Sequence, residues 1–168
     1  PQGALQIIHR EADPFDEQAV EKHLARNTEP LPCGCSGTAV RQFPTHATAL
    51  FEATGTRSWP VKLRLVPPTA PFLKGAHLLI AADCAGAASA RFHQLAKDKI
   101  ILIACPKFED AAAMRGRLAE LRHVAAPASV TVLRMEVPCC TGLAALCREV
   151  FGLGVREVIM GCDGEPKA

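Results

Sequence analysis

The chain has 168 residues, of which 49% are hydrophobic and 21% charged, and its formal net charge is +2. This length predicts one domain with a core large enough to fold without staples, and the composition excludes disordered, collagen-like and low-complexity proteins. The charge is nearly balanced and forms no basic stripe, so nucleic acid is not expected as a partner. The longest apolar run, residues 76–82, is too short to cross a membrane.

The first part of the chain is polar and carries few structural signals. Residues 5–8 predict a short strand, and Asp16 predicts the N-terminal cap of a helix over residues 17–26. A loop rich in proline and glycine follows, after which a helix is expected to begin at Thr38 and to end before Pro44.

Four apolar runs predict strands that are buried on both faces, as in a parallel sheet covered by helices. They comprise residues 76–82, 99–104, 129–135 and 155–161. Between them, apolar residues at helical spacing predict helices over residues 109–123 and 142–151. Residues 61–66 alternate apolar and basic, which predicts an edge strand that is antiparallel or belongs to a separate edge. This alternation of strands and helices predicts an α/β fold with three layers and a mostly parallel sheet, flavodoxin-like or Rossmann-like.

Eight cysteines are the unusual feature of the composition. In a small secreted domain they would predict disulfides, but this chain is able to form its own core. The clusters Cys33-Gly34-Cys35 and Cys139-Cys140 are also too tight for unstrained short-range pairing. Grouped thiols in a reducing compartment more often bind metal or carry out redox chemistry, which predicts a cytoplasmic protein.

Cysteines follow each of the four predicted buried strands. Cys84, Cys105 and Cys162 each come just after the end of a strand, as does the pair Cys139 and Cys140. The carboxyl ends of parallel strands share one edge of a sheet, and ligands bind at that edge. Neighbouring strands lie about 4.8 Å apart. The sequence therefore predicts that thiols distant along the chain gather into one metal site.

The chemistry of this site is that of a soft metal. Thiolates select zinc or iron–sulfur clusters, and an iron–sulfur cube takes four of them. Helices are expected to begin after Cys105, with Pro106 in the first position, and after Cys140. Their positive ends would favour thiolates and a negatively charged cluster. Lys107 adds a cation, and it is a candidate cofactor-binding residue together with Gly34 in the first cysteine loop.

Other side chains near the thiols have structural interpretations. Cys147 lies on the apolar stripe of its predicted helix and is assigned to the core, whereas Cys162 stands in a predicted loop, where packing or an exposed thiol competes with ligation. Asp83 and Glu136 flank the thiols and would either act as general acids or cap the following helices. No catalytic residue is identified, and no glycine-rich phosphate loop favours a nucleotide or flavin.

Five segments, distributed between residues 31 and 143, carry further motifs. They are Leu-Pro-Cys-Gly-Cys-Ser-Gly at 31–37, Trp-Pro-Val-Lys-Leu-Arg-Leu-Val-Pro-Pro-Thr-Ala-Pro-Phe at 59–72, Leu-Leu-Ile-Ala-Ala-Asp-Cys at 78–84, Leu-Ile-Ala-Cys-Pro-Lys-Phe-Glu-Asp at 102–110 and Met-Glu-Val-Pro-Cys-Cys-Thr-Gly-Leu at 135–143. These segments resemble a family of 4Fe–4S-binding, ferredoxin-like proteins of anaerobic bacteria and archaea.

The resemblance implies an iron–sulfur cluster and electron transfer. The family pattern corresponds to Cys33, Cys35, Cys84, Cys105, Cys139 and Cys140 as ligands. These are more thiols than one cube requires, so either some support the ligands from outside or the cluster is larger or unusual. Members of the family usually carry a two-cluster ferredoxin module upstream. Residues 1–30 are therefore expected to be a lead-in segment after a missing ferredoxin module, and residues 31–168 a cysteine-rich α/β iron–sulfur domain.

The function predicted from the sequence is that of an iron–sulfur redox protein whose partner is a ferredoxin module or another redox protein. One form of this function is a reductase domain that the ferredoxin module supplies with electrons. The alternative is a zinc-stabilised structural or thiol-sensing module without electron transfer.

Overall fold

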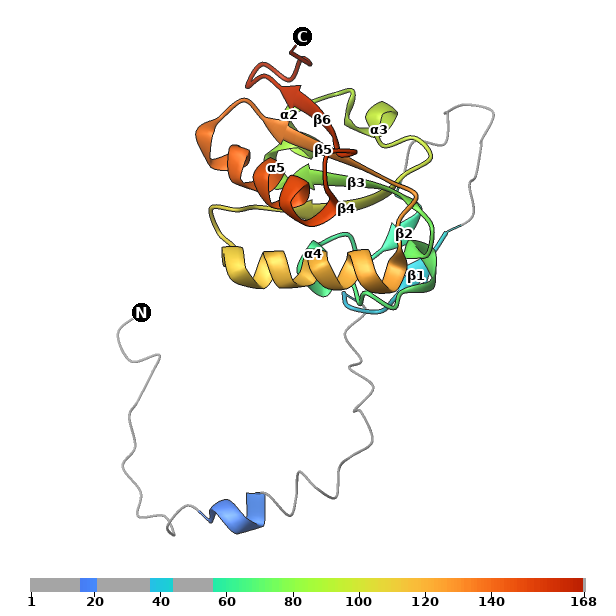
Figure 1. Ribbon diagram of the computed structural model, residues 1–168, viewed down its shortest axis with the longest axis vertical. Helices are drawn as coiled ribbons and strands as arrows, with labels where there is room; N and C mark the ends of the chain where they lie inside the picture. The colour runs from blue at the N-terminus through green and yellow to red at the C-terminus, as the bar shows by residue number, and fades with distance from the viewer. Residues whose placement is uncertain (1–15, 21–36, 44–55, 168) are drawn as a thin grey trace, which may run out of the picture. The chain divides into compact units, whose positions relative to one another are not determined.

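The computed structural model describes residues 16–20, 37–43 and 56–167 (Figure 1). The chain divides into two compact units, residues 1–34 and residues 35–168. Each unit is considered by itself below.

In the first unit, the described residues contain the beginning of a helix at residues 17–20. The Oδ1 of Asp16 accepts a hydrogen bond from the N–H of Ala19 at 3.0 Å. A carboxylate at this position satisfies an N–H group that has no partner within the helix. The predicted cap at Asp16 is confirmed, whereas the rest of that helix and the predicted strand at residues 5–8 lie outside the described residues.

The second unit is built on a parallel sheet of four strands. In spatial order they are β4 (Ile100–Ala104), β3 (His77–Ala82), β5 (Ser129–Met135) and β6 (Arg156–Met160). The central strands β3 and β5 are buried along most of their length, which explains why most of their residues are apolar. The predicted parallel sheet is confirmed, and each strand ends within one residue of its predicted limits.

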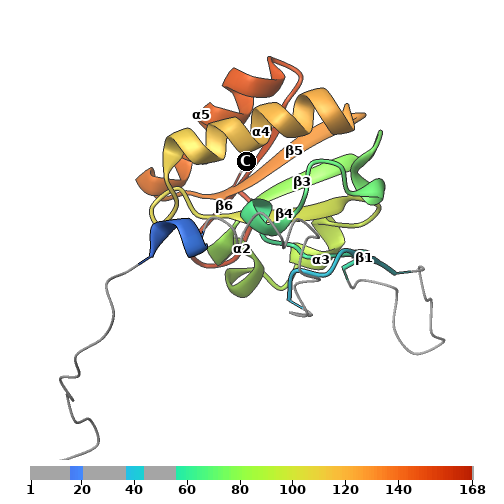
Figure 2. The same ribbon diagram turned by 90° about the horizontal axis from the view of Figure 1, so that it is seen from below.

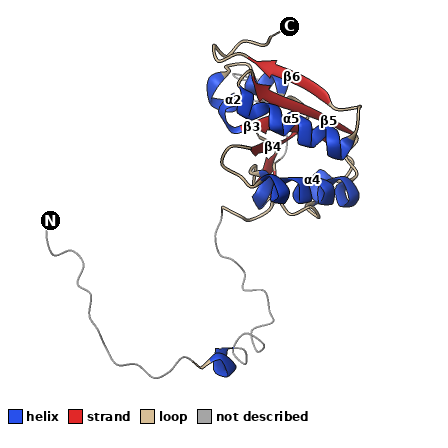
Figure 3. Ribbon diagram, turned by 60° about the vertical axis from the view of Figure 1, so that its left-hand side comes forward, coloured by secondary structure: helices blue, strands red, loops and turns tan. Residues whose placement is uncertain are grey.

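Helices cover both faces of this sheet. Figure 2 shows α4 (Ala111–Ala125) and α5 (Pro138–Phe151) on one face and α2 (Asp83–Ala88) and α3 (Phe92–Leu95) on the other. Figure 3 shows the four strands side by side, with α5 lying across them. The predicted α/β fold with three layers is therefore confirmed. None of these helices, nor any other among the described residues, is long and apolar enough to cross a membrane.

The first residues of the two long helices determine where the nearby cysteines lie. The Oδ1 of Asp110 caps α4 by accepting the N–H of Ala113 at 2.7 Å. Helix α5 begins at Pro138, four residues before the predicted start, because the fixed φ of proline suits the first turn of a helix. Cys139 and Cys140 were expected to precede this helix, but they lie in its first turn.

The helix predicted from Thr38 is absent from residues 37–43. In its place β1 (Arg41–Gln42) pairs antiparallel with β2 (Ser58–Trp59), and the indole N–H of Trp59 donates to the carbonyl of Gly37 at 3.0 Å. A helix confined between Thr38 and Pro44 would be too short to be stable alone. The partner strand, distant along the chain, determines the local structure.

The edge strand predicted at residues 61–66 is also wrong in most of its length. Lys62 forms one parallel bridge with Ile103, and the chain then turns into the 3-10 helix η1 (Leu63–Leu65). Leu63 and Val66, three residues apart, are 1% and 0% exposed, whereas Leu65 is 42% exposed. Burial therefore follows a spacing of three and not the alternation of a strand. A second 3-10 helix, η2 (Pro71–Leu73), leads into β3.

Candidate metal centre

The carboxyl ends of the four strands meet at one edge of the sheet because the strands are all parallel. From β3 the chain passes to β4 on one side, whereas β5 and β6 lie on the other side. This change of direction makes the carboxyl ends of β3 and β5 a topological switch point. Open α/β sheets bind their ligands in the crevice at such a point.

Each of the four strands is followed by a cysteine at this edge. Cys84 is the second residue after β3, Cys105 the first after β4, and Cys162 the second after β6. Cys139 and Cys140 follow β5 in the first turn of α5. The prediction that these thiols emerge at one edge of the sheet is confirmed.

Cys140 shares its electrostatic environment with two other thiols, Cys139 and Cys84. The residue is 4% exposed, and burial raises the pKa of its thiol above the usual 9.0. A hydrogen bond with the backbone of Met135 lowers this pKa, while the neighbouring Cys139 and Cys84 raise it further. Thiols from α2 and α5 thus lie near each other at the switch point between β3 and β5.

The N-terminus of α5 contributes to this environment. No side chain caps the helix, whose first residues are Pro138, Cys139 and Cys140. The positive end of a helix favours thiolate over thiol. The expected start after Cys140 is wrong, since both thiols lie within the first turn of the helix.

Cys105 opens a turn over residues 105–110. The N–H of Glu109 donates to the carbonyl oxygen of Cys105 at 3.0 Å, and a helix begins only at the end of the turn. Pro106 therefore lies in this turn and not, as predicted, in the first position of a helix. Lys107, the candidate cofactor-binding cation, is exposed in the same turn.

A network of charges joins the Cys105 turn to β3. The Nζ of Lys62 lies 2.5 Å from the Oδ2 of Asp83 and 3.3 Å from the Oε1 of Glu109. The same oxygen of Glu109 accepts the N–H of Cys105 at 2.9 Å. Burial alone would lower the pKa of Lys62, but the hydrogen bonds and charges of the two carboxylates raise it above 10.5. The network holds the turn at residues 105–110 next to Asp83, the residue that precedes Cys84.

Sequence reasoning missed the roles of Lys62 and Glu109 in this network. Its only signal was the basic residue in the pattern at residues 61–66. Asp83, which was expected to act as a general acid or a cap, pairs with Lys62, and α2 has no side-chain cap. Capping by Asp83 is therefore wrong.

The remaining cysteines and Glu136 have structural roles. The Oε1 of Glu136 accepts the N–H of Cys162 at 2.9 Å, which links the ends of β5 and β6, so the predicted capping of α5 by Glu136 is wrong. Cys162 is exposed. Cys147 is 0% exposed, and burial raises the pKa of its thiol to about 12. Its assignment to the core is confirmed.

Not every predicted ligand falls within the described part of the chain. Cys33, Gly34 and Cys35 lie outside it. All six cysteines within it are free. Among the described residues, no group of three or more His, Cys, Asp or Glu side chains is arranged to hold a metal ion. The candidate ligands at the switch point and beside it are Cys84, Cys105, Cys139 and Cys140.

The fold agrees with a comparison against protein families. A family model described as a Rossmann-like domain matches residues 70–164, which include all four strands of the parallel sheet. An uncharacterized protein of Archaeoglobus fulgidus is 40% identical over 87 residues, which cover 52% of this chain and 61% of that protein. The chain thus spans less than two thirds of that relative's length. No solved structure matches the chain. By its match over more than half of its length, the chain belongs to the family of Rossmann-like domains.

Proposed function

We propose that this protein binds an iron–sulfur cluster at the carboxyl edge of its sheet and uses it to transfer electrons. One observation carries the proposal: Cys105, Cys84 and the pair Cys139 and Cys140 follow three adjacent strands, β4, β3 and β5. Ligands of open α/β sheets bind at this edge, and thiolates select soft metals and iron–sulfur clusters.

The set of donors suits a cluster of several irons. A 4Fe–4S cluster is held by four thiolates, so its ligands surround a group of atoms and not a single point. Adjacent strands about 4.8 Å apart space such ligands along the edge. Cys139 and Cys84 both raise the pKa of Cys140, and Cys105 follows the neighbouring strand. When bound there, the cluster would supply one-electron redox chemistry.

The surrounding charges support a negatively charged cluster. Burial, and after it the neighbouring Cys139 and Cys84, raises the pKa of Cys140. Metal ions bind the thiolate forms, and their positive charge offsets the repulsion between these thiolates. The N-terminus of α5 stabilises added negative charge, which raises the reduction potential of a cluster bound beside it.

Exposure at the edge supports electron exchange with a partner protein. Cys84 and Cys139 are exposed, so the centre would lie at the surface. The resemblance described above favours a ferredoxin module or another redox protein as this partner. Free thiols persist in reducing compartments, and we propose a cytoplasmic location on that ground.

Cys33 and Cys35 are proposed as further ligands. The proposal for Cys33 rests on the sequence alone. The strand β1 is antiparallel to β2, whereas Lys62, shortly after β2, bridges parallel to β4. The described residues before β1, from Gly37 onward, therefore lie toward the carboxyl end of β4, and Cys35 is two positions before Gly37 in the sequence.

The test is anaerobic reconstitution of the full chain with ferrous iron and sulfide. We expect brown protein with broad visible absorption that bleaches on addition of dithionite, and iron and acid-labile sulfide in similar amounts. Serine in place of Cys84, Cys105, Cys139 or Cys140 should lower the bound iron and change the electron paramagnetic resonance spectrum of the reduced protein. Cys35→Ser tests the additional ligand in the same assay.

Cys162→Ser is the matched control, because Cys162 is an exposed thiol at the same edge but follows β6. This variant should keep its iron. Colourless protein that binds zinc in stoichiometric amount would support the zinc-stabilised module and contradict the proposal. Iron content that is the same in the control and in the variants at Cys84, Cys105, Cys139 and Cys140 would also contradict it.

A further inference from the structure

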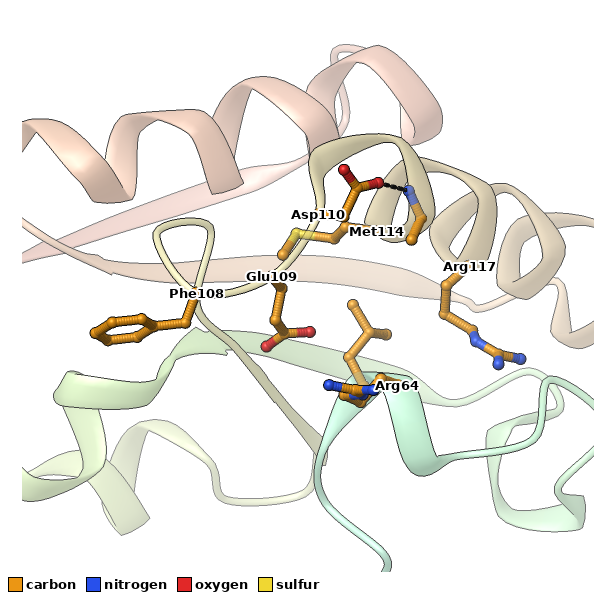
Figure 4. Close-up of a pocket in the computed structure, with 8 residues that line it drawn as sticks. Arg64, Phe108, Glu109, Asp110, Met114 and Arg117 are labelled. Atoms are coloured by element: carbon orange, nitrogen blue, oxygen red, sulfur yellow. Dashed lines mark hydrogen bonds between the residues drawn. The ribbon is translucent and has the colours of Figure 1, made fainter.

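A cavity of about 370 Å³ lies beside the turn that Cys105 opens. It is bounded by η1 on one side and by the turn and the beginning of α4 on the other. Figure 4 shows Phe108 at one end of the cavity and Arg117 at the other, with Glu109 and Arg64 between them. This volume falls at the lower end of the range of cavities that bind small organic molecules.

Most charged groups around the cavity already have partners. The Oε1 of Glu109 receives hydrogen bonds from Lys62 and from the N–H of Cys105. The Oδ1 of Asp110 caps α4, and Arg117 pairs with Glu120 at 3.1 Å. Ligand binding would have to break these contacts in order to use the same atoms.

Arg64 is the exception among the charged groups that line the cavity. Within the described parts of the chain it makes no hydrogen bond or ion pair, and its side chain borders the cavity from η1. A guanidinium group carries a permanent positive charge and pairs with carboxylates through two parallel hydrogen bonds. Arg64 is therefore the cation that the cavity offers to a ligand without loss of a contact among the described residues.

Apolar side chains form the rest of the lining. Leu63 and Met114, which are 1% and 3% exposed, belong to the core and form part of the wall. Phe108 is 84% exposed although it is a large aromatic side chain. An aromatic ring in this position offers a flat surface against which another ring stacks.

We propose that this cavity binds a small aromatic carboxylate. Arg64 pairs with the carboxylate, Phe108 packs against the ring, and Leu63 and Met114 contact the apolar atoms. Because Phe108, Glu109 and Asp110 line the cavity and belong to the turn that Cys105 opens, a bound ligand would rest against the segment that carries a proposed cluster ligand. The binding itself does not depend on the cluster.

The test is a titration of the full chain, labelled with ¹⁵N, with benzoate. Benzyl alcohol serves as the neutral probe and benzylamine as the cationic probe. Benzoate should shift the amide signals of Phe108, Asp110 and Met114, with a dissociation constant of about 1 mM or below. Benzyl alcohol should bind at least about tenfold more weakly, because it lacks the charge that pairs with Arg64.

Two variants test the assigned contacts, and both residues are exposed enough for folding to be unaffected. Arg64→Gln should weaken benzoate binding about tenfold, and Phe108→Ala should weaken it about threefold or more. Arg115→Gln is the control, because Arg115 is an exposed arginine of α4 that does not line the cavity, and it should leave benzoate binding unchanged. The titration is repeated with iron-loaded and iron-free protein, so failure of cluster binding does not affect the outcome.

Several results would overturn the proposal. One is an absence of shifts in the amide signals at about 10 mM benzoate. Another is benzoate binding that is equally tight in wild type and in Arg64→Gln, or in wild type and in Phe108→Ala. The third is tighter binding of benzylamine than of benzoate.

Discussion

Replacing Lys62 with methionine should destabilise the fold, because among the described residues Lys62 is the cation that contacts both Asp83 and Glu109. Methionine preserves most of the apolar stem and removes the ammonium group. The two carboxylates would then lack a counter-charge. The Oδ1 of Asp83 is already buried without a hydrogen-bond partner, so this carboxylate depends strongly on the contact through its other oxygen.

The magnitude follows from the exposure of the three side chains. Lys62 is 33% exposed, Asp83 32% and Glu109 13%. Hydrogen bonds to charged groups contribute about 1.5–3 kcal/mol when buried, and exposed ion pairs about 0.2–1 kcal/mol. Partial screening places each contact near 1 kcal/mol, so the expected loss in the free energy of unfolding is about 2 kcal/mol.

Urea denaturation is the suitable assay, followed by the fluorescence of Trp59, the single tryptophan of the chain. Lys74→Met is the matched control, because Lys74 is exposed and forms no ion pair with the described residues. It should change the free energy of unfolding by less than about 0.5 kcal/mol.

The difference between wild type and Lys62→Met should also depend on pH. The pKa of Lys62 is raised above 10.5 in the folded protein, so its contribution is present below that pH. The contribution is lost as the pH rises through the raised pKa. A loss below about 0.5 kcal/mol at neutral pH, or a difference that persists unchanged well above the pKa of Lys62, would refute this reasoning.

Three further predictions concern the stability of the fold. Burial raises the pKa of the Cys147 thiol from 9.0 to about 12, so the unfolded chain loses the proton first. Stability should therefore fall by about 1.4 kcal/mol per pH unit between these values, and Cys147→Ala should abolish that slope in denaturation curves at alkaline pH. Asp110→Ala should lower the free energy of unfolding by about 1 kcal/mol in urea, because it removes the cap of α4, and Asp110→Asn should restore most of the loss. Gly164→Ala should lower the melting temperature, because Gly164 has a φ of +84° and an added Cβ would lie 2.2 Å from the carbonyl oxygen of Ala88. An unchanged melting temperature would contradict the conclusion that only glycine fits at position 164.

The sheet was predictable because its strands are buried on both faces. The run of apolar residues at 78–82, for example, coincides with the buried part of β3. The order of the strands did not follow from the sequence alone, but parallel pairing did. Parallel pairing was sufficient to place Cys84, Cys105 and Cys139 at one edge.

The turns around the cysteines were less predictable. The periodicity of α5 is clear only from Leu143 onward, so the helix predicted from the sequence begins at residue 142 and misses the first turn at Pro138. At residues 61–66 the alternating pattern concealed a 3-10 turn, in which the N–H groups of Leu65 and Val66 both donate to the carbonyl of Lys62. Short elements carry too few residues for periodicity to distinguish them.

The charge network could not be predicted, because it joins residues that are distant in sequence. Lys62 and Glu109 are 47 positions apart, and nothing in either local pattern specifies the other. Such contacts depend on the strand order, which brings the segment before η1 beside β4. A sequence pattern therefore located the thiols but not the side chains that hold their turns in place.

The most direct test of the account is anomalous X-ray scattering at the iron edge from crystals of the full chain grown without oxygen. The account predicts one iron-containing peak at the carboxyl edge of the sheet, within bonding distance of the sulfur atoms of Cys84, Cys105 and the pair Cys139 and Cys140. An anomalous signal at the zinc edge alone, or iron bound away from these three strand ends, would contradict it.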